Sequence, residues 1–333
     1  MFDRLYLVMR HGGLVVDRGA DWSTQRILNG HATECITADP RRPNRVFAGT
    51  FENGLQRSSD GGDTFEPIGV DTIDEEAVMS VSISPHDPDV VLVGTEPSAL
   101  YRSEDGGDTW QALSDLDTLP SSDEWFFPPR PHTHHVRWIE VDPHEASRLY
   151  VGIEAGAFLL STDGGETWID RPEGSMVDNH TLSTHRDAPG RVYAAAGDGF
   201  GVSTDGGETW HHPEDGLDHR YVWGMAVDPG DPDTVVVSAA SGARSAHSPP
   251  GEAYLYRLTE PSGTWTRLDG RGIPTGQGTL RAVIAGGVMD GELVAATDGG
   301  MYHSTDGGSS WDEVPTEWPE TFHGQTARGV AVV

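Results

Sequence analysis

The chain has 333 residues, with 53 acidic and 22 basic side chains and a formal net charge of -31. This acid excess repels nucleic acid and anionic membrane surfaces, so the sequence predicts no nucleic-acid partner and no membrane partner. A hydrophobic fraction of 36% with 10 Trp argues against disorder, because such a chain can bury a packed core.

The choice of basic residue points to the host. Every basic residue is Arg, and Lys is absent. This composition is similar to that of proteins from halophilic archaea, in which molar salt screens the repulsion between surface carboxylates. We therefore expect a haloarchaeal host. The single cysteine, Cys35, excludes an intramolecular disulfide and is expected to be a small core residue.

The first predicted strands cover residues 5–10 and 13–17, and a segment that resembles a turn follows at residues 17–22. Charged residues surround the one short apolar stretch at the N-terminus, and no small-residue cleavage site follows it, so no secretory signal is predicted. No run approaches the ~18 apolar residues that a membrane helix needs. The expected location is the cytoplasm.

One motif, S-x-D-x-G-x-T-W, recurs along the chain with little change. Its five copies cover residues 58–65, 103–110, 161–168, 203–210 and 304–311, and the last gap has room for a degenerate copy at residues 262–265. The motif is a hairpin turn in which Asp accepts hydrogen bonds from the turn's own amides and the Gly pair supplies positive φ. Repeats of about 40–60 residues are typical of propeller blades or solenoid units.

Two further strands precede each motif, so each unit contains four short antiparallel strands. The innermost strands are expected to begin near residues 34, 79, 137, 180, 223 and 281, and a seventh lies at residues 327–333. We therefore predict an all-β, seven-bladed β-propeller with four-stranded antiparallel blades, forming one domain over residues 1–333. The closing blade would join residues 1–29 to 325–333, and the other blades would cover approximately 30–70, 71–120, 130–172, 176–215, 218–270 and 276–316. Closure removes a free sheet edge.

Alignment of the inner strands places one variable position at the end opposite the motif turns. Its residues are Glu34, Met79, Arg137, His180, Trp223, Arg281 and Arg328. We expect them to surround the mouth of the central channel, where Arg137, Arg281 and Arg328 would bind a carboxylate or phosphate. Glu34, His135, Tyr221 and Trp223 would complete this ligand site. The alternative is a structural network, in which acidic turn residues such as Glu154 neutralise the arginines.

A long connection at residues 121–135 carries Trp125 and Phe126, and it is too aromatic for a simple connector. These rings would stack on a sugar at the channel mouth. The alternative is that they only plug the end of the propeller.

Glu154 and His180 are the predicted acid/base residues, since the unperturbed pKa of His lies near neutrality. A metal site at His134, His135 and His180 is a weaker alternative, because no known ligand spacing is matched. No metal is therefore expected. No G-x-S-x-G motif, Walker loop or dinucleotide fingerprint is present, and no cofactor is expected.

The five motifs resemble the Asp boxes of the BNR superfamily, which includes sialidases, xyloglucan-cleaving glycoside hydrolases, the sortilin ectodomain and photosystem II assembly factors. Residues 128–137 and 150–154 are similar to haloarchaeal BNR-repeat proteins labelled glycosyl hydrolase. The resemblance implies a glycoside hydrolase or lyase that acts on an anionic sugar. Arg137, Arg281, Arg328, Tyr221 and Glu154 match the sialidase arginine triad, nucleophile and acid by residue type, but the sialidase F/Y-R-I-P motif is absent. The assembly factors imply the alternative, a non-enzymatic scaffold that binds a partner protein or peptide.

Overall fold

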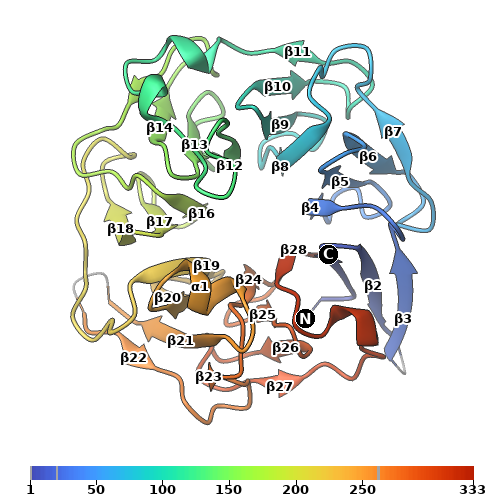
Figure 1. Ribbon diagram of the computed structural model, residues 1–333, viewed down its shortest axis with the longest axis vertical. Helices are drawn as coiled ribbons and strands as arrows, with labels where there is room; N and C mark the ends of the chain where they lie inside the picture. The colour runs from blue at the N-terminus through green and yellow to red at the C-terminus, as the bar shows by residue number, and fades with distance from the viewer. Residues whose placement is uncertain (1, 20–21, 261–262) are drawn as a thin grey trace.

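The computed structural model describes residues 2–19, 22–260 and 263–333. These residues form seven antiparallel sheets that stand radially around a central axis, so the predicted all-β, seven-bladed propeller is confirmed (Figure 1). Within the same residues, no helix is both long and apolar enough to cross a membrane.

Each sheet is one blade, and its strands run outward from the axis. The innermost strands are β4 (Thr33–Ala38), β8 (Ala77–Ile83), β12 (Val136–Val141), β16 (Asn179–Thr184), β19 (Tyr221–Asp228), β24 (Val283–Gly286) and β28 (Ala327–Val332). The second strands are β5 (Val46–Thr50), β9 (Val91–Glu96), β13 (Leu149–Ile153), β17 (Val192–Ala196), β20 (Asp231–Ala240), β25 (Leu293–Ala296) and β1 (Arg4–Met9). The third strands are β6 (Leu55–Ser58), β10 (Leu100–Ser103), β14 (Phe158–Ser161), β18 (Gly199–Ser203), β21 (Glu252–Leu258), β26 (Met301–Ser304) and β2 (Gly12–Arg18).

Except for β3 (Trp22–Ile27), the outermost strands have only two or three residues, as is usual for exposed edges. These short strands are β7 (Glu66–Ile68), β11 (Gln111–Ala112), β15 (Ile169–Asp170), β22 (Thr266–Arg267) and β27 (Asp312–Glu313). Four short helices lie in connections: η1 (Leu116–Thr118), η2 (Ser122–Glu124), α1 (Ala243–His247) and η3 (Glu320–Phe322). We number the blades one to six from β4 onward, and call the seventh the closing blade.

The closing blade joins the two ends of the chain. Its strand order is β28-β1-β2-β3, and Leu7 of β1 lies opposite Val330 of β28. Strand β28 thus supplies the inner strand that the N-terminal segment lacks. This arrangement confirms the predicted closure (Figure 1).

Two blades do not have the four-stranded sheet of the others. In blade four the sheet is β16-β17-β18, and only an isolated bridge between Val202 and His211 marks the place of the outer strand. In blade five an additional strand, β23 (Gly276–Gln277), pairs with β21.

The five complete Asp boxes form the predicted turns. In the box of blade one, the Asp60 carboxylate accepts hydrogen bonds from the Thr64 amide at 2.9 Å and the Thr64 hydroxyl at 2.6 Å. The Ser58 hydroxyl accepts the amide of Gly62, and φ is +78° at Gly61 and +97° at Gly62. The box-like segment at residues 17–22 and the degenerate copy at 262–265 each include positions outside the described residues.

The Asp boxes lie on one face of the propeller, together with the turns between first and second strands. Arg4 at the start of β1 donates to the Gly61 carbonyl oxygen, and Arg148 just before β13 donates to the Gly206 oxygen, each across a blade boundary. The first residues of the inner strands therefore lie towards the opposite face.

Candidate functional site

The inner strands share an irregularity at the end that lies away from the Asp boxes. Among the described residues, six of the seven inner strands have a β-bulge there, which leaves one residue of each strand without a partner on the second strand. These bulge residues are Glu34, Met79, Arg137, His180, Trp223 and Arg328. A bulge re-aims the side chain of its extra residue. Arg281, the remaining member of the aligned set, lies two residues before β24 begins.

A channel with a volume of about 380 Å³ lies along the axis between the inner strands. Met79, Arg137, Trp223 and Arg328 line the end of it that lies opposite the Asp boxes. Arg137 and Trp223 are only 5% and 4% exposed, and Arg281 is fully buried. Arg137, Trp223 and Arg281 are therefore buried at this end of the axis, whereas the sequence predicted that the aligned residues surround the channel mouth.

Trp223 lies at the centre of this packing. The guanidinium carbon of Arg281 lies 4.1 Å from the centroid of the Trp223 ring, and that of Arg137 lies 5.1 Å away. The His180 ring stacks on Trp223 with a centroid distance of 4.0 Å. The indole thus stabilises two cations, Arg137 of blade three and Arg281 of blade six, through its π face.

The three arginines differ in how their charges are compensated. Arg328 forms an ion pair with Glu34 at 3.3 Å, and Arg137 Nε lies 3.7 Å from Glu154 Oε2. None of the ion pairs that the described residues form includes Arg281. Burial, together with the charges of Arg328 and Arg137, lowers the pKa of Arg281 well below its usual range. The cluster therefore holds one guanidinium without a carboxylate partner.

Neutral groups hold Arg281 in place. Its Nη1 donates to the Ala327 carbonyl oxygen at 2.8 Å, and its Nε donates to Nδ1 of His247 at 3.3 Å. Burial and the Arg281 charge lower the pKa of His247 to about 2, so this imidazole stays neutral and bonds to the Tyr221 hydroxyl through Nε2. The buried Nη2 of Arg281 has no hydrogen-bond partner among the described residues.

His135 lies between two acidic turn residues. Such contacts belong to the structural network that the sequence offered as the alternative to a ligand site. Its Nε2 lies 2.9 Å from Glu154 Oε2, and its Nδ1 lies 3.3 Å from Glu96 Oε2. Burial opposes protonation, but the two carboxylates outweigh it and raise the pKa of His135. Burial also opposes ionisation of Glu96, yet His135 and Arg130 lower the pKa of Glu96 to about 2. The Arg130 guanidinium thus neutralises the charge of the Glu96 carboxylate.

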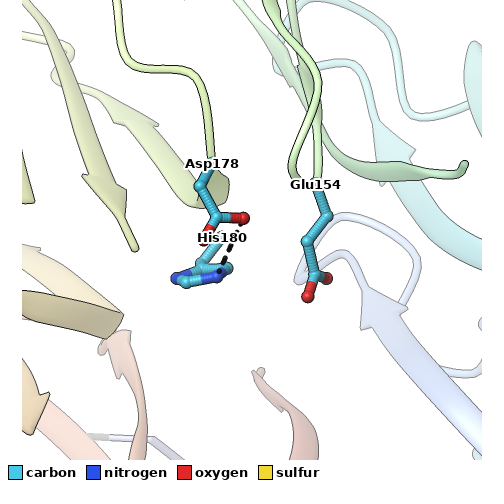
Figure 2. A group of neighbouring side chains, drawn as sticks. All are labelled: Glu154, Asp178 and His180. Carbon is cyan, nitrogen blue, oxygen red and sulfur yellow. Dashed lines mark ion pairs between the residues drawn. The ribbon is translucent and has the colours of Figure 1, made fainter. Parts of the chain in front are cut away.

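Glu154 and His180 come together with a third residue, Asp178, which precedes β16 (Figure 2). One ligand atom from each residue can be chosen so that all three atoms lie within 4.8 Å of one another. His180 Nε2 lies 3.6 Å from Asp178 Oδ1, and His180 Nδ1 lies 2.7 Å from the Val222 carbonyl oxygen. Sequence reasoning gave Asp178 no role in the site, because Asp178 lies just before the strand that carries His180.

The two carboxyl groups have pKa values shifted in opposite directions. Burial raises the pKa of Asp178, and the charge of Glu154 raises it further. For Glu154, the hydrogen bond from His135 and the nearby positive charge outweigh burial and hold its pKa below the usual range. Burial lowers the pKa of His180. Carboxyl groups held in unlike environments can divide the roles of acid and base between them.

Other predicted site residues lie elsewhere. Trp125 is buried among apolar side chains of blades two and three, and its indole donates to Ser121, so the prediction of an exposed stacking ring is wrong for Trp125. Phe126 is 49% exposed. His134 contacts Ser98 and Trp125, so the structure does not assemble the alternative set of His134, His135 and His180.

Comparison with known proteins agrees with the fold. The BNR/Asp-box repeat model matches residues 202–212, within blade four. No curated protein matches the sequence. An ancestral GH74 enzyme is 15% identical with a TM-score of 0.63, over 90% of this chain and 38% of that chain. The GH74 enzyme of Niastella koreensis is 19% identical with a TM-score of 0.63, over 84% and 46%.

A second kind of protein is similar over most of its own length. YCF48 bound to D1 peptide is 17% identical with a TM-score of 0.61, over 92% of this chain and 88% of that chain. By contrast, this chain spans less than half the length of the two GH74 enzymes. These identities support the fold alone. The chain is a seven-bladed Asp-box propeller that resembles the GH74 enzymes and YCF48.

Proposed function

We propose that the protein binds a small anionic ligand, such as a sugar acid, at the axial end opposite the Asp boxes. The observation that carries this proposal is Arg281, a fully buried guanidinium that forms no ion pair with any described residue. A buried charge without a counter-charge is costly, and an anion would remove that cost. Arg137 and Arg328 lie beside the channel end and would offer further donors.

The surroundings favour a ligand that has a ring as well as a charge. The channel of about 380 Å³ has the volume of a small-molecule site, and Trp223 is one of the residues that line it. The planar side chains of Trp223 and His180 at such a site suit a sugar ring. Hydrolase or lyase chemistry with Glu154 and His180 as acid/base groups stays a prediction, and ligand binding does not require it.

The test is thermal unfolding of the full chain in about 2–3 M KCl, which screens the acidic surface. The panel contains sugar acids, inorganic phosphate and neutral oligosaccharides. A sugar acid present at one hundred times its Kd would stabilise the fold by about 2.7 kcal/mol and raise the midpoint. Arg281→Met should remain folded and lose this shift. Arg271→Met, at an exposed position, is the matched control and should keep it.

A second function is favoured by a different observation. The similarity to YCF48 covers nearly all of that protein, and the structure compared contains D1 peptide. Two exposed apolar residues, Phe126 and Val177, lie beside the turn that carries Glu154, since both contact it through backbone hydrogen bonds. Such a surface suits a peptide or protein partner. If no small anion changes the midpoint of thermal unfolding, the anion site is rejected and this scaffold function is favoured.

A further inference from the structure

We infer that Glu154, Asp178 and His180 form a binding site for a divalent transition-metal ion, for which Zn²⁺ is the probe. The three side chains come from adjacent blades three and four and point toward one another (Figure 2). Their closest set of ligand atoms lies within 4.8 Å. Ligands that hold zinc at about 2.0–2.2 Å are themselves about 3–4 Å apart, so small side-chain movements would complete the site.

His180 provides the independent evidence for a ligand. It is fully buried, and its Nε2 has no hydrogen-bond partner among the described residues. Its Nδ1 faces the Val222 carbonyl oxygen at 2.7 Å, which can only accept, so Nδ1 must carry the proton. The lone pair of a neutral imidazole is then on Nε2, which faces Asp178. A histidine that donates one ring N–H to a backbone carbonyl is oriented as metal-binding histidines are.

Within the described part of the chain, no group donates a hydrogen bond to Nε2, and the nearest groups are negatively charged. Asp178 Oδ1 lies 3.6 Å from Nε2, and the Glu154 carboxylate completes the group. A third carboxylate, Asp198, accepts the amides of Val177 and Asp178. Arg137, at 3.7 Å, and His135, at 2.9 Å, both compensate the charge of Glu154, and no cation among the described residues pairs with the other two carboxylates. A divalent cation would supply both the missing positive charge and the missing partner of Nε2.

The two carboxylates are held in position before any ion binds. Asp178 Oδ1 accepts the Ala155 amide at 2.9 Å, which ties it to the turn of Glu154. Glu154 is in turn held by His135 at 2.9 Å. A Cβ atom on Gly197 would lie 1.8 Å from Asp178 Oδ2, so the carboxylate occupies space that only glycine leaves open.

The donor set decides the class of metal. One imidazole nitrogen and two carboxylate oxygens suit zinc and its neighbours in the first transition row, whereas calcium and magnesium prefer oxygen alone. The Asp178 side chain is 31% exposed, which gives an ion a path from solvent. The inference does not rest on the proposed anion site, because neither Arg281 nor the channel contributes a ligand.

The experiment titrates Zn²⁺ into the full chain after removal of metals with EDTA, and measures binding by calorimetry. We expect one ion per chain. His180→Ala and Asp178→Asn should each weaken zinc binding at least tenfold. His134→Ala removes a nearby histidine that faces Ser98 and should leave zinc affinity unchanged. Mg²⁺ should bind much more weakly than Zn²⁺. Thermal unfolding of each variant reports whether it is folded.

A second variant leaves all three ligands in place. Gly197→Ala should displace Asp178 and weaken zinc binding, whereas Gly299→Ala should not, because its Cβ would have no neighbour closer than 3.8 Å. If His180→Ala does not fold, the comparison of Gly197→Ala with Gly299→Ala tests the zinc site instead. Absence of zinc binding in the parent, or full affinity in both Asp178→Asn and Gly197→Ala, would overturn the inference. If the chain binds zinc but no anion shifts its unfolding midpoint, the proposed anion site is rejected and the zinc site is not.

Discussion

At the scale of single residues, equivalent positions of the propeller carry different chemistry. Arg328 and Arg281 lie at corresponding places in the closing blade and blade six, yet Glu34 pairs with Arg328 and no described carboxylate pairs with Arg281. A buried pair is close to neutral for stability, whereas a buried unpaired charge is unfavourable. This unpaired guanidinium is the observation on which we propose an anionic ligand at the axis.

Glu140 on β12 leads to a prediction about pH. Its carboxyl accepts hydrogen bonds from the Thr184 amide and hydroxyl, and burial raises its pKa from 4.5 to about 7. Between these values the folded chain holds a proton that the unfolded chain has released, so stability falls as the pH rises from about 4.5 through about 7. Glu140→Gln should remove this loss, which is on the order of 1–3 kcal/mol.

The measurement is the free energy of unfolding in guanidinium chloride at several values between pH 5 and pH 8, for the parent and for Glu140→Gln. The free energy of unfolding of the variant should rise relative to that of the parent as the pH increases, because Gln keeps an acceptor for Thr184 without a charge. A difference between the two proteins that is constant over this range would show that the Glu140 carboxyl does not titrate there.

Sequence reasoning identified the residues at the axis but not their burial. Periodicity placed Arg137, His180 and Trp223 at equivalent positions, and the structure brings them into contact. It could not show that Trp223 packs against Arg281 and Arg137, since those contacts depend on packing across blades. Trp125 was predicted to be exposed because it lies in a long loop, yet burial of its large apolar surface with blade-two and blade-three side chains is more favourable. Asp178 was missed because it precedes the strand.

At the scale of elements, the Asp box explains why so much of the fold could be predicted. The hydrogen bonds of its Ser and Asp side chains stay within a few residues, so the motif specifies its own turn. Details that depend on neighbours were not predicted. The outer strand of blade four is reduced to a bridge at His211, and Pro213 follows, which has no amide to donate to a ladder. The β-bulges also have no clear sequence signature.

Ser203 tests the energetic role of the Asp box in blade four. Its buried hydroxyl donates to Asp205 at 2.8 Å and accepts the Gly207 amide at 2.9 Å. Ser203→Ala leaves that buried amide without a partner, which costs about 1–3 kcal/mol. Thr204→Ala, at the exposed neighbouring position, should change stability by less than about 0.5 kcal/mol. Chemical denaturation of both variants provides the comparison, and equal losses would contradict the assigned role.

At the scale of the whole molecule, closure was predictable because the N-terminal segment begins one strand too late. The strand order β28-β1-β2-β3 supplies the missing strand from the other end of the chain. Closure also brings Arg328 to the axis, where it lies beside the channel together with Arg137. Integrity of the ring and assembly of the charged cluster are therefore coupled, since β28 contributes to both.

The net charge of -31 belongs to no single element and predicts how stability depends on salt. Repulsion between the carboxylates destabilises the folded chain, and the screening length falls from about 10 Å at 0.1 M salt to about 3 Å at 1 M. The unfolding midpoint at pH 7 should therefore rise by at least several degrees between 0.1 M and 2.5 M KCl. Near pH 4.6, the isoelectric point of the sequence, the chain has no net charge and the rise should be much smaller. An equal rise at both pH values would show that salt acts by exclusion from the protein surface and not by screening of its charge.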